Sequence, residues 1–412
     1  MEILRAPRRS VGDNAIDASD GECQAERCHG SVLGFPSSPG EHHSCPSEES
    51  NDLMLCAGGT DTDVPAKRYF RPTTMAIRVY NLALVGFGNV GKELVRLLLA
   101  KETELRRDYN IAWRLTGAAS RRVGWVANAN GLDPAALLNH NWPEPPAGRP
   151  PTNVREWLAE SKADVLFEAT SLDRRTGYPA TDHLKAALEY GAHAISANKG
   201  PIVHAYGELS DLARAKNRRF LFESTVMDGT PIFSMFPYGL PAVELRGFRG
   251  ILNSTTNVVL TEMEKGLSLD EAVKKAQEIG VAETDPADDL DGWDPAVKVA
   301  ALVIVLMGVP IKLDQVERVG IRAILPSEVR AARAEGMRYK LVCRAERTAE
   351  GVRAAVGPER LPMSDPLALL EGTTSALRFD TDVFGLSIIE HKPGIIATAY
   401  GLFADFIRAV AI

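Results

Sequence analysis

The chain has 412 residues, which is too long for one ordinary hydrophobic core and predicts at least two domains. Hydrophobic residues make up 45% and charged residues 25% of the sequence, a composition typical of soluble globular proteins. The formal net charge of -7 gives no general attraction to nucleic acid or to anionic membranes, and the apolar run at residues 299–307 is too short to span a bilayer. The composition therefore favours chemistry on a small-molecule substrate, with no nucleic acid and no membrane as partners.

Residues 1–74 are predicted to form a disordered N-terminal extension, because they are rich in Ser, Gly, Pro, Asp and Glu and show no sustained periodicity. Strand and helix patterning begins abruptly at Met75, so an alternative is that the natural protein starts there. Four of the five cysteines lie in this extension, and their spacing fits no zinc motif. Only Cys343 lies in the part predicted to fold, which agrees with a cytoplasmic protein.

The first strong motif is a glycine-rich turn between a strand at residues 79–85 and a helix at residues 92–99. Its glycines would let the backbone approach a pyrophosphate at the helix N-terminus, as in dinucleotide-binding proteins. A tight strand-to-helix turn without a ligand is the alternative. The residues of the motif are Gly86, Phe87, Gly88, Asn89, Val90 and Gly91.

A second strand is predicted at residues 113–119, and Ser120 and Arg121 follow it. An acidic residue at this point would bind the ribose hydroxyls of NAD, whereas an arginine accommodates the extra phosphate of NADP. We therefore interpret Arg121 as favouring NADP, with NAD as the second cofactor to test. A surface arginine without a ligand is the alternative.

The next segments continue an alternating α/β pattern, which predicts a parallel sheet. Thr170 and Ser171 follow a buried strand, and Lys199 follows the next one along the chain. Because ligands bind beyond the carboxyl ends of such strands, these residues are expected at the same edge as the glycine-rich turn. An exposed lysine in a turn is the alternative for Lys199. The pattern comprises a loop at 142–151, strands at 165–169, 192–197 and 220–223, and helices at 180–190 and 209–216.

From Ser224 onward the pattern changes to an α+β type. Ser268 and Glu271 form a capping box that opens a helix ending at Gly280. The other predicted elements are a turn-rich junction at 223–231, a helix beginning near 257, a helix at 295–307, strands at 316–324 and 340–356, and a last helix at 396–410.

A run of carboxylates at residues 283–294 precedes the helix at 295–307, and it is the most distinctive stretch of the chain. Asp294 is predicted to cap that helix, and Lys298 lies four residues later on the same helix face. The helix N-terminus would lower the pKa of a lysine so placed and let it exchange a proton. An N-cap with a surface ion pair and an acidic turn is the alternative.

Taken together, these features resemble the homoserine dehydrogenase family, from about Met75 to the end of the chain. Members interconvert L-aspartate 4-semialdehyde and L-homoserine with NAD(P) in threonine, methionine and isoleucine biosynthesis. The resemblance implies a Rossmann-type dinucleotide-binding domain at 75–224, completed by a C-terminal helix at 395–412. It also implies an inserted α+β catalytic and dimerisation domain at 225–394, and a homodimer.

The resemblance also implies roles for individual residues. Lys298 and Lys199 would be the catalytic lysines, and Lys199 and Gly394 would also contact the cofactor. The substrate would be bound by Glu283, Asp289, Asp294 and Thr225. A sodium ion would be held by Glu223, Val226, Asp228 and Thr230.

Two alternatives to this family function remain open. Met227 and Asp228 stand where the family usually has Gly-Ala, which favours a related dehydrogenase acting on a different amino-aldehyde or hydroxy acid. A non-catalytic dinucleotide-sensing or scaffold protein is a second alternative, but it would have little reason to keep Glu283, Asp294, Lys298 and Lys199 together. No regulatory domain is expected after Ile412, so feedback by threonine through such a domain is not expected.

Overall fold

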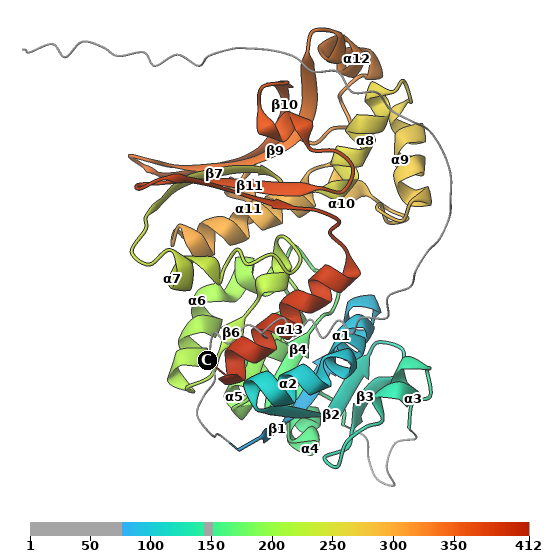
Figure 1. Ribbon diagram of the computed structural model, residues 1–412, viewed down its shortest axis with the longest axis vertical. Helices are drawn as coiled ribbons and strands as arrows, with labels where there is room; N and C mark the ends of the chain where they lie inside the picture. Colours follow the sequence, from blue (N-terminus) through green and yellow to red (C-terminus); the bar gives the residue numbers. More distant parts are fainter. Residues whose placement is uncertain (1–75, 144–150, 412) are drawn as a thin grey trace, which may run out of the picture. The chain divides into compact units, whose positions relative to one another are not determined.

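The structure is a computed structural model that describes residues 76–143 and 151–411. The predicted N-terminal extension and most of the predicted loop at 142–151 lie outside these residues. The described part contains two six-stranded sheets with helices packed on them, so the predicted α/β class is confirmed (Figure 1). None of its helices has the length and apolar character needed to cross a membrane.

The first sheet has the strand order β3-β2-β1-β4-β5-β6. Its strands are parallel except for β3, which forms an unpredicted antiparallel hairpin with β2. The strands are β1 (Arg78–Val85), β2 (Ile111–Ser120), β3 (Gly124–Ala127), β4 (Val165–Glu168), β5 (His193–Ser196) and β6 (Phe220–Leu221).

Both faces of this sheet are covered by helices, which explains why its strands are continuous apolar runs. Leu82 and Leu84 belong to a buried cluster with α1 (Asn89–Ala100), α2 (Glu102–Tyr109) and α13 (Ile395–Ala411). The alternate residues Ala83 and Val85 belong to a cluster on the other face. That cluster includes side chains of α4 (Val154–Ser161), α5 (Ala180–Tyr190) and α6 (Gly200–Ala215).

The second sheet has the strand order β12-β11-β7-β9-β10-β8. Of the predicted strand at 316–324, only the two residues of β8 form a strand, so the rest of that prediction is wrong. The predicted strand at 340–356 is instead part of a longer hairpin formed by β9 and β10. That hairpin turns at Gly351, whose φ of 137° is a conformation that side chains disfavour. The strands are β7 (Leu245–Ile251), β8 (Glu317–Arg318), β9 (Met337–Thr348), β10 (Gly351–Pro362), β11 (Ser375–Thr381) and β12 (Gly385–Glu390).

Helices cover one face of the second sheet, where Leu260 and Leu302 share a buried cluster with Phe248 and Leu341 (Figure 1). The capping box predicted at Ser268 is present at the start of α9. The helices of this region are α7 (Met235–Gly239), α8 (Ser254–Glu264), α9 (Leu269–Glu278), α10 (Ala287–Leu290), α11 (Trp293–Leu306) and α12 (Pro326–Ala334). The short α3 (Pro134–Leu138) packs on the first sheet's cluster through Leu137.

Helix α13 connects the end of the chain to the turn that follows β6. It packs along α1, and its Gly401 lies against the backbone of Gly229. A Cβ atom on Gly401 would come within 2.3 Å of Ser224 Oγ and 3.0 Å of Asp228 O. Glycine at this position is therefore needed for the close approach.

Candidate active site

A cavity of about 790 Å3 lies at the carboxyl ends of β1, β2 and β4. Strand β1 lies between β2 and β4, so this is the point of an α/β sheet at which ligands bind. The cavity is lined by residues 85–89, Lys92, residues 119–125, His140, Trp142, residues 169–171, Pro179 and His183.

The glycines of the predicted motif shape this cavity in three different ways. Gly86 has φ of 94°, and a Cβ atom there would lie 2.4 Å from the carbonyl carbon of Ala169. A Cβ atom on Gly91 would lie 2.7 Å from the carbonyl oxygen of Gly86, so this glycine brings α1 against the turn. No atom lies within 4 Å of the Cβ position of Gly88, so a pyrophosphate can approach its backbone from the cavity.

Seven of the predicted cofactor-binding residues lie on the cavity wall: Gly86, Phe87, Gly88, Asn89, Arg121, Thr170 and Ser171. Four do not line it: Val90, Gly91, Lys199 and Gly394. Gly394 instead donates its N–H to Asp228 Oδ2 at 2.6 Å. A cofactor contact for these four stays a prediction.

A cluster of polar side chains joins α6, α8, α10 and α11 around the carboxylate of Asp294. Lys199 Nζ lies 3.2 Å from Asp294 Oδ1, and Lys298 Nζ lies 3.2 Å from Asp294 Oδ2. Asn253, directly before α8, donates from Nδ2 to Asp294 Oδ2 at 3.1 Å and to Asp289 Oδ1 at 2.6 Å. The structure thus brings together both predicted catalytic lysines and two of the predicted substrate-binding acids.

The charges of this cluster perturb one another. Burial raises the pKa of Asp294, but the ammonium groups of Lys298 and Lys199 outweigh it and hold that pKa below its ordinary value. Burial lowers the pKa of Lys298, but the adjacent Asp294 outweighs it and raises that pKa above its ordinary value. Burial and repulsion from Asp294 raise the pKa of Asp289.

The predicted cap at Asp294 is wrong. Helix α11 begins at Trp293, and Gly292 occupies the N-cap position with φ of 78°. Asp294 lies inside the first turn, where the two lysines and an amide take its oxygens in place of backbone N–H groups. Burial and the helix terminus were expected to lower the pKa of Lys298 and the neighbouring carboxylates to raise it, which left the net direction open. In the structure the carboxylate of Asp294 outweighs burial, and the pKa is raised. Lys298 Nζ also donates to the carbonyl of Leu252 at 2.6 Å.

Two predicted substrate-binding residues lie outside the cluster. Glu283 is exposed, and only its backbone carbonyl is engaged, by the Gln277 amide at 3.0 Å. Thr225 is buried, and its hydroxyl donates to Phe222 O at 2.8 Å. Their roles stay predictions.

The carboxylate of Glu223, predicted to hold sodium, is already engaged by hydrogen-bond donors. It accepts the N–H groups of Phe233 at 2.6 Å and Ser234 at 3.0 Å. Arg408 Nη2 lies 2.9 Å from Oε2, the oxygen that also accepts the Ser234 N–H, so a guanidinium provides the positive charge. These contacts do not fit a cation on the carboxylate. Among the residues at 76–143 and 151–411, no group of three or more His, Cys, Asp or Glu side chains is arranged to hold a metal ion.

Asp405 and Arg408 were not predicted as members of this network. The buried Asp405 accepts the N–H of Glu223 at 2.8 Å and pairs with Arg408. Burial raises the pKa of Asp405 to about 7, since Arg408 lowers it only in part and Glu223 raises it further. Two charged residues within the apolar helix at 396–410 were the sequence signal for this network.

A Rossmann-type cavity together with a partly buried Lys-Asp-Lys cluster defines the protein as an NAD(P)-dependent oxidoreductase. Residues 86–223 match the family model "Homoserine dehydrogenase, NAD binding domain", and residues 231–407 match the family model "Homoserine dehydrogenase". The chain belongs to the homoserine dehydrogenase family.

Individual relatives agree with this assignment. The chain is 35% identical to the NAD(+)-dependent homoserine dehydrogenase of Pseudomonas canavaninivorans, over 80% of this chain and 96% of the relative. Among solved structures, a putative homoserine dehydrogenase from Archaeoglobus fulgidus has a TM-score of 0.71 at 28% identity, over 81% of this chain and all of the other. A hyperthermophilic archaeal homoserine dehydrogenase mutant in complex with NADPH has a TM-score of 0.68 at 27% identity, over 81% of this chain and 98% of the other.

Proposed function

We propose that the protein interconverts L-aspartate 4-semialdehyde and L-homoserine with NAD(P), a step of threonine, methionine and isoleucine biosynthesis. The observation that carries this proposal is the carboxylate of Asp294 held between Lys199 and Lys298. Lys199 follows β5 of the dinucleotide-binding sheet, so the cluster is joined directly to that sheet. A cytoplasmic location stays a prediction.

The two domains would have different functions, cofactor binding and substrate binding. Residues 75–224, together with the helix at 395–412, would bind the dinucleotide, because the cavity and its glycine turn belong to them. Residues 225–394 would bind the substrate, orient it and form the dimer. Lys199 would be the catalytic residue that the dinucleotide-binding domain supplies.

The proposed mechanism assigns proton transfer to Lys298. The dinucleotide, when bound, would give or take the hydride. The raised pKa keeps Lys298 as an ammonium group, the form that can donate a proton to the aldehyde oxygen in the reductive direction. In the oxidative direction Lys298 would first lose that proton and then accept one from the homoserine hydroxyl. Lys199 would stabilise negative charge on the same oxygen, and Glu283 and Asp289 would hold the substrate ammonium group.

We propose NADP as the preferred cofactor because Arg121 lies on the cavity wall at the end of β2. Its guanidinium makes no ion pair within the described ranges, so it is free to pair with a 2′-phosphate. Arg121→Ala should raise the KM for NADP by about tenfold, the usual scale for loss of one charged hydrogen bond, and leave the KM for NAD unchanged. Arg96→Ala on the outer face of α1 is the control. An equal rise for both cofactors would reject the assignment.

We propose that sodium is bound by backbone carbonyls of the turn at 223–230, because Arg408 already neutralises Glu223. Activity titrated with sodium, with potassium as the control, tests this part of the proposal.

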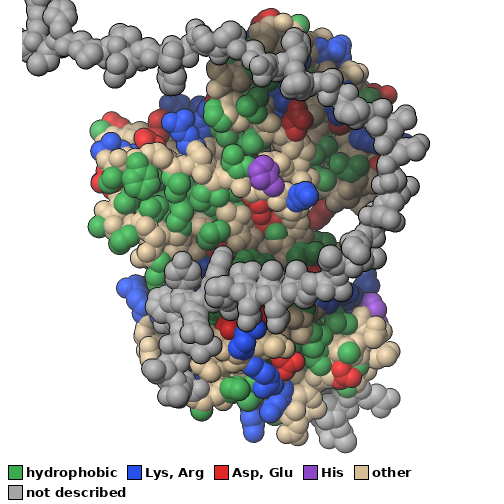
Figure 2. Space-filling model, viewed as in Figure 1, with side chains coloured by type: hydrophobic (Ala, Val, Ile, Leu, Met, Phe, Trp, Pro, Cys, Tyr) green, Lys and Arg blue, Asp and Glu red, His purple; other side chains and the backbone are tan. Residues whose placement is uncertain are grey.

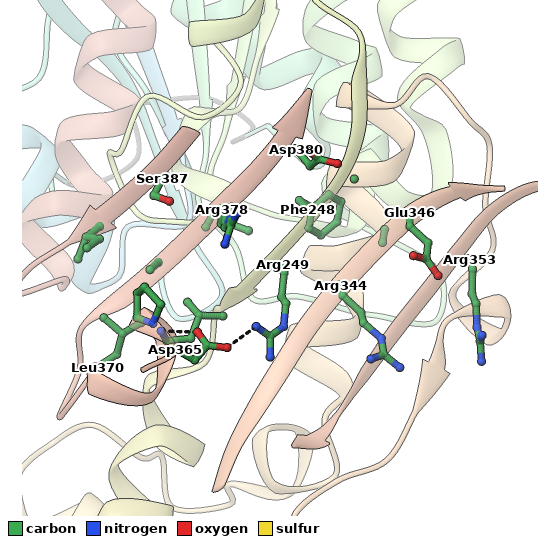
Figure 3. Close-up of a pocket in the computed structure, with 17 residues that line it drawn as sticks. Phe248, Arg249, Arg344, Glu346, Arg353, Asp365, Leu370, Arg378, Asp380 and Ser387 are labelled. Carbon is green, nitrogen blue, oxygen red and sulfur yellow. Dashed lines mark hydrogen bonds and ion pairs between the residues drawn. The ribbon is translucent and has the colours of Figure 1, made fainter. Parts of the chain in front are cut away.

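We propose that two copies associate through the uncovered face of the second sheet. Strand register places Ser387, Arg378, Arg249 and Arg344 in one row across β12, β11, β7 and β9 (Figure 3). Asp380 and Glu346 lie two residues along the same strands, so a row of acids parallels the row of bases.

The same face carries apolar side chains beside the row of bases, on the side away from the acids. Leu367, Leu370, Ala376 and Ile389 line a cavity of about 350 Å3 there. Figure 2 shows hydrophobic side chains gathered over the part of the molecule where Figure 1 labels β7 and β11. A surface with apolar residues and adjacent rows of opposite charge is self-complementary under two-fold symmetry.

A substrate panel tests the proposed reaction directly. The full chain would be supplied with L-homoserine and other hydroxy amino acids and hydroxy acids, each with NADP and with NAD, while reduced nicotinamide absorbance is followed. The highest kcat/KM is expected for L-homoserine. A higher value for another substrate would favour the related dehydrogenase suggested by Met227 and Asp228, and no turnover with any substrate would favour a dinucleotide sensor.

A further inference from the structure

Glu168 is a buried carboxylate directly before Ala169, which lines the dinucleotide cavity. It is the last residue of β4, and none of its surface is exposed. Its Oε1 accepts the N–H of Thr170 at 3.0 Å and the Thr170 hydroxyl, and its Oε2 accepts the hydroxyl of Ser196 at 3.1 Å. Within residues 76–143 and 151–411, its one ion-pair partner is His183, whose Nδ1 lies 3.8 Å from Oε1.

His183 is nearly enclosed, yet it contributes to the cavity wall. Its side chain is 9% exposed, and its ring packs edge-on against Trp125, with centroids 5.7 Å apart at 85°. Nδ1 is buried without a hydrogen-bond partner, and Nε2 makes no hydrogen bond to any residue that the structure describes. Buried polar atoms are ordinarily paired, so an imidazole with both nitrogens unpaired at a cavity wall is available to a ligand.

The position of His183 identifies the part of the ligand that it would meet. Trp125 lies on β3, next to the end of β2 where Arg121 stands. In dinucleotide-binding sheets the end of the second strand binds the adenosine ribose. The His183 and Trp125 pair therefore belongs to the adenosine half of the cavity, away from the reacting nicotinamide.

We propose that His183 is a cofactor-binding residue that hydrogen-bonds the adenosine half of the dinucleotide through Nε2, with Nδ1 directed at Glu168. The carboxylate fixes the ring orientation, because the nitrogen facing it is then the protonated one. Trp125 holds the ring plane from the side. The inference rests on the dinucleotide site of the proposed function and adds a residue that sets cofactor affinity.

Amide substitutions distinguish the two ring nitrogens. His183→Gln places an amide near the position of Nε2, whereas His183→Asn places one near Nδ1 and leaves the ligand side empty. The ligands are ADP, which carries only the adenosine half, and nicotinamide mononucleotide, which carries the other half. Binding would be measured by calorimetry on the full chain, with His193→Gln at the amino end of β5 as the control.

We expect His183→Asn to weaken ADP binding by about tenfold, the scale of one lost hydrogen bond, and His183→Gln to weaken it by less than about threefold. Nicotinamide mononucleotide binding should be unchanged in both variants. Equal ADP affinities in wild type and both variants, or retention by Asn with loss by Gln, would overturn the inference. NADP is titrated into wild type as well, and failure of wild type to bind NADP would instead refute the proposed function, so the two failures are distinguishable.

Discussion

Lys298 is the residue whose chemistry is most sharply defined by its neighbours, because its Nζ contacts both a carboxylate and a carbonyl. Lys298→Ala should lower kcat by on the order of a hundredfold or more, the usual contribution of a general acid or base. The dissociation constant for NADP should stay unchanged, since Lys298 does not line the dinucleotide cavity.

Lys298→Arg separates proton transfer from charge. Arginine keeps the positive charge but cannot give up a proton near neutral pH, so it should not restore kcat. If the Arg variant kept most of the activity, Lys298 would be an electrostatic anchor and Lys199 the proton donor. Lys274→Ala, on the exposed side of α9, is the control for loss of a lysine.

Asp294 should set the pH dependence of the reaction. It raises the pKa of Lys298, so in homoserine oxidation the basic form of Lys298 gains population only as pH rises toward that pKa. Asp294→Asn removes the charge, so the pKa of Lys298 should fall and the rising limb of log(kcat/KM) against pH should move to lower pH.

Asp288→Asn is the matched control for this shift, since Asp288 is exposed and pairs with Arg174 outside the lysine cluster. A pH profile unchanged by Asp294→Asn would exclude Lys298 as the titrating base.

At the scale of elements, the parallel strands of the first sheet were predictable because each carries a local signal, whereas the antiparallel β3 was not predicted. The run from β1 through the glycine turn into α1 is contiguous, and β4 and β5 are short apolar segments followed by polar turns. The second sheet was harder to predict, since its strands β7, β11 and β12 have one face with arginines and acids. The charged residues on that face interrupt the continuous apolar runs, and they blur the apolar-polar alternation, from which strands are predicted.

The candidate site was also predictable only in part, because several of its contacts join residues far apart in the sequence. The motif placed Asp294 and Lys298 together because they are four residues apart in one helix. Asn253 and Lys199, which complete the cluster, come from other segments, and the Arg408 and Glu223 pair spans 185 residues. No local pattern encodes such pairs.

The close approach of α13 to the turn after β6 can be tested with two glycines. Gly401→Ala would place a Cβ atom 2.3 Å from Ser224 Oγ. The same Cβ atom would lie 3.0 Å from Asp228 O and 3.1 Å from Gly229 Cα. It should lower the free energy of unfolding by about 1–3 kcal/mol, the usual cost of overpacking. Gly207→Ala lies in α6 with no atom within 4 Å, so it should raise that free energy by up to about 1 kcal/mol.

Urea unfolding of both glycine variants measures these changes. If Gly401→Ala proved as stable as wild type, α13 would not be held in register by this contact.

At the scale of the whole molecule, the open face of the second sheet should decide the assembly state. The charged side chains of Arg344, Glu346, Arg378 and Asp380 are exposed there in the single chain, and Ile389 beside them is 48% exposed. A second copy would cover this arrangement. The chain mass is 44.7 kDa, so sedimentation at micromolar concentration should give about twice this mass if the dimer forms.

Arg378 lies within the row of bases, so Arg378→Glu should put like charges opposite each other across the two-fold axis and shift the protein toward monomer. Lys274→Glu makes the same change of charge on the exposed side of α9 and should leave the assembly unchanged. Since the dinucleotide cavity lies at the strand ends of the first sheet, the monomeric variant should still bind NADP. A wild-type chain that sediments as a monomer, or an Arg378→Glu variant that remains dimeric, would show that two copies do not meet through this face.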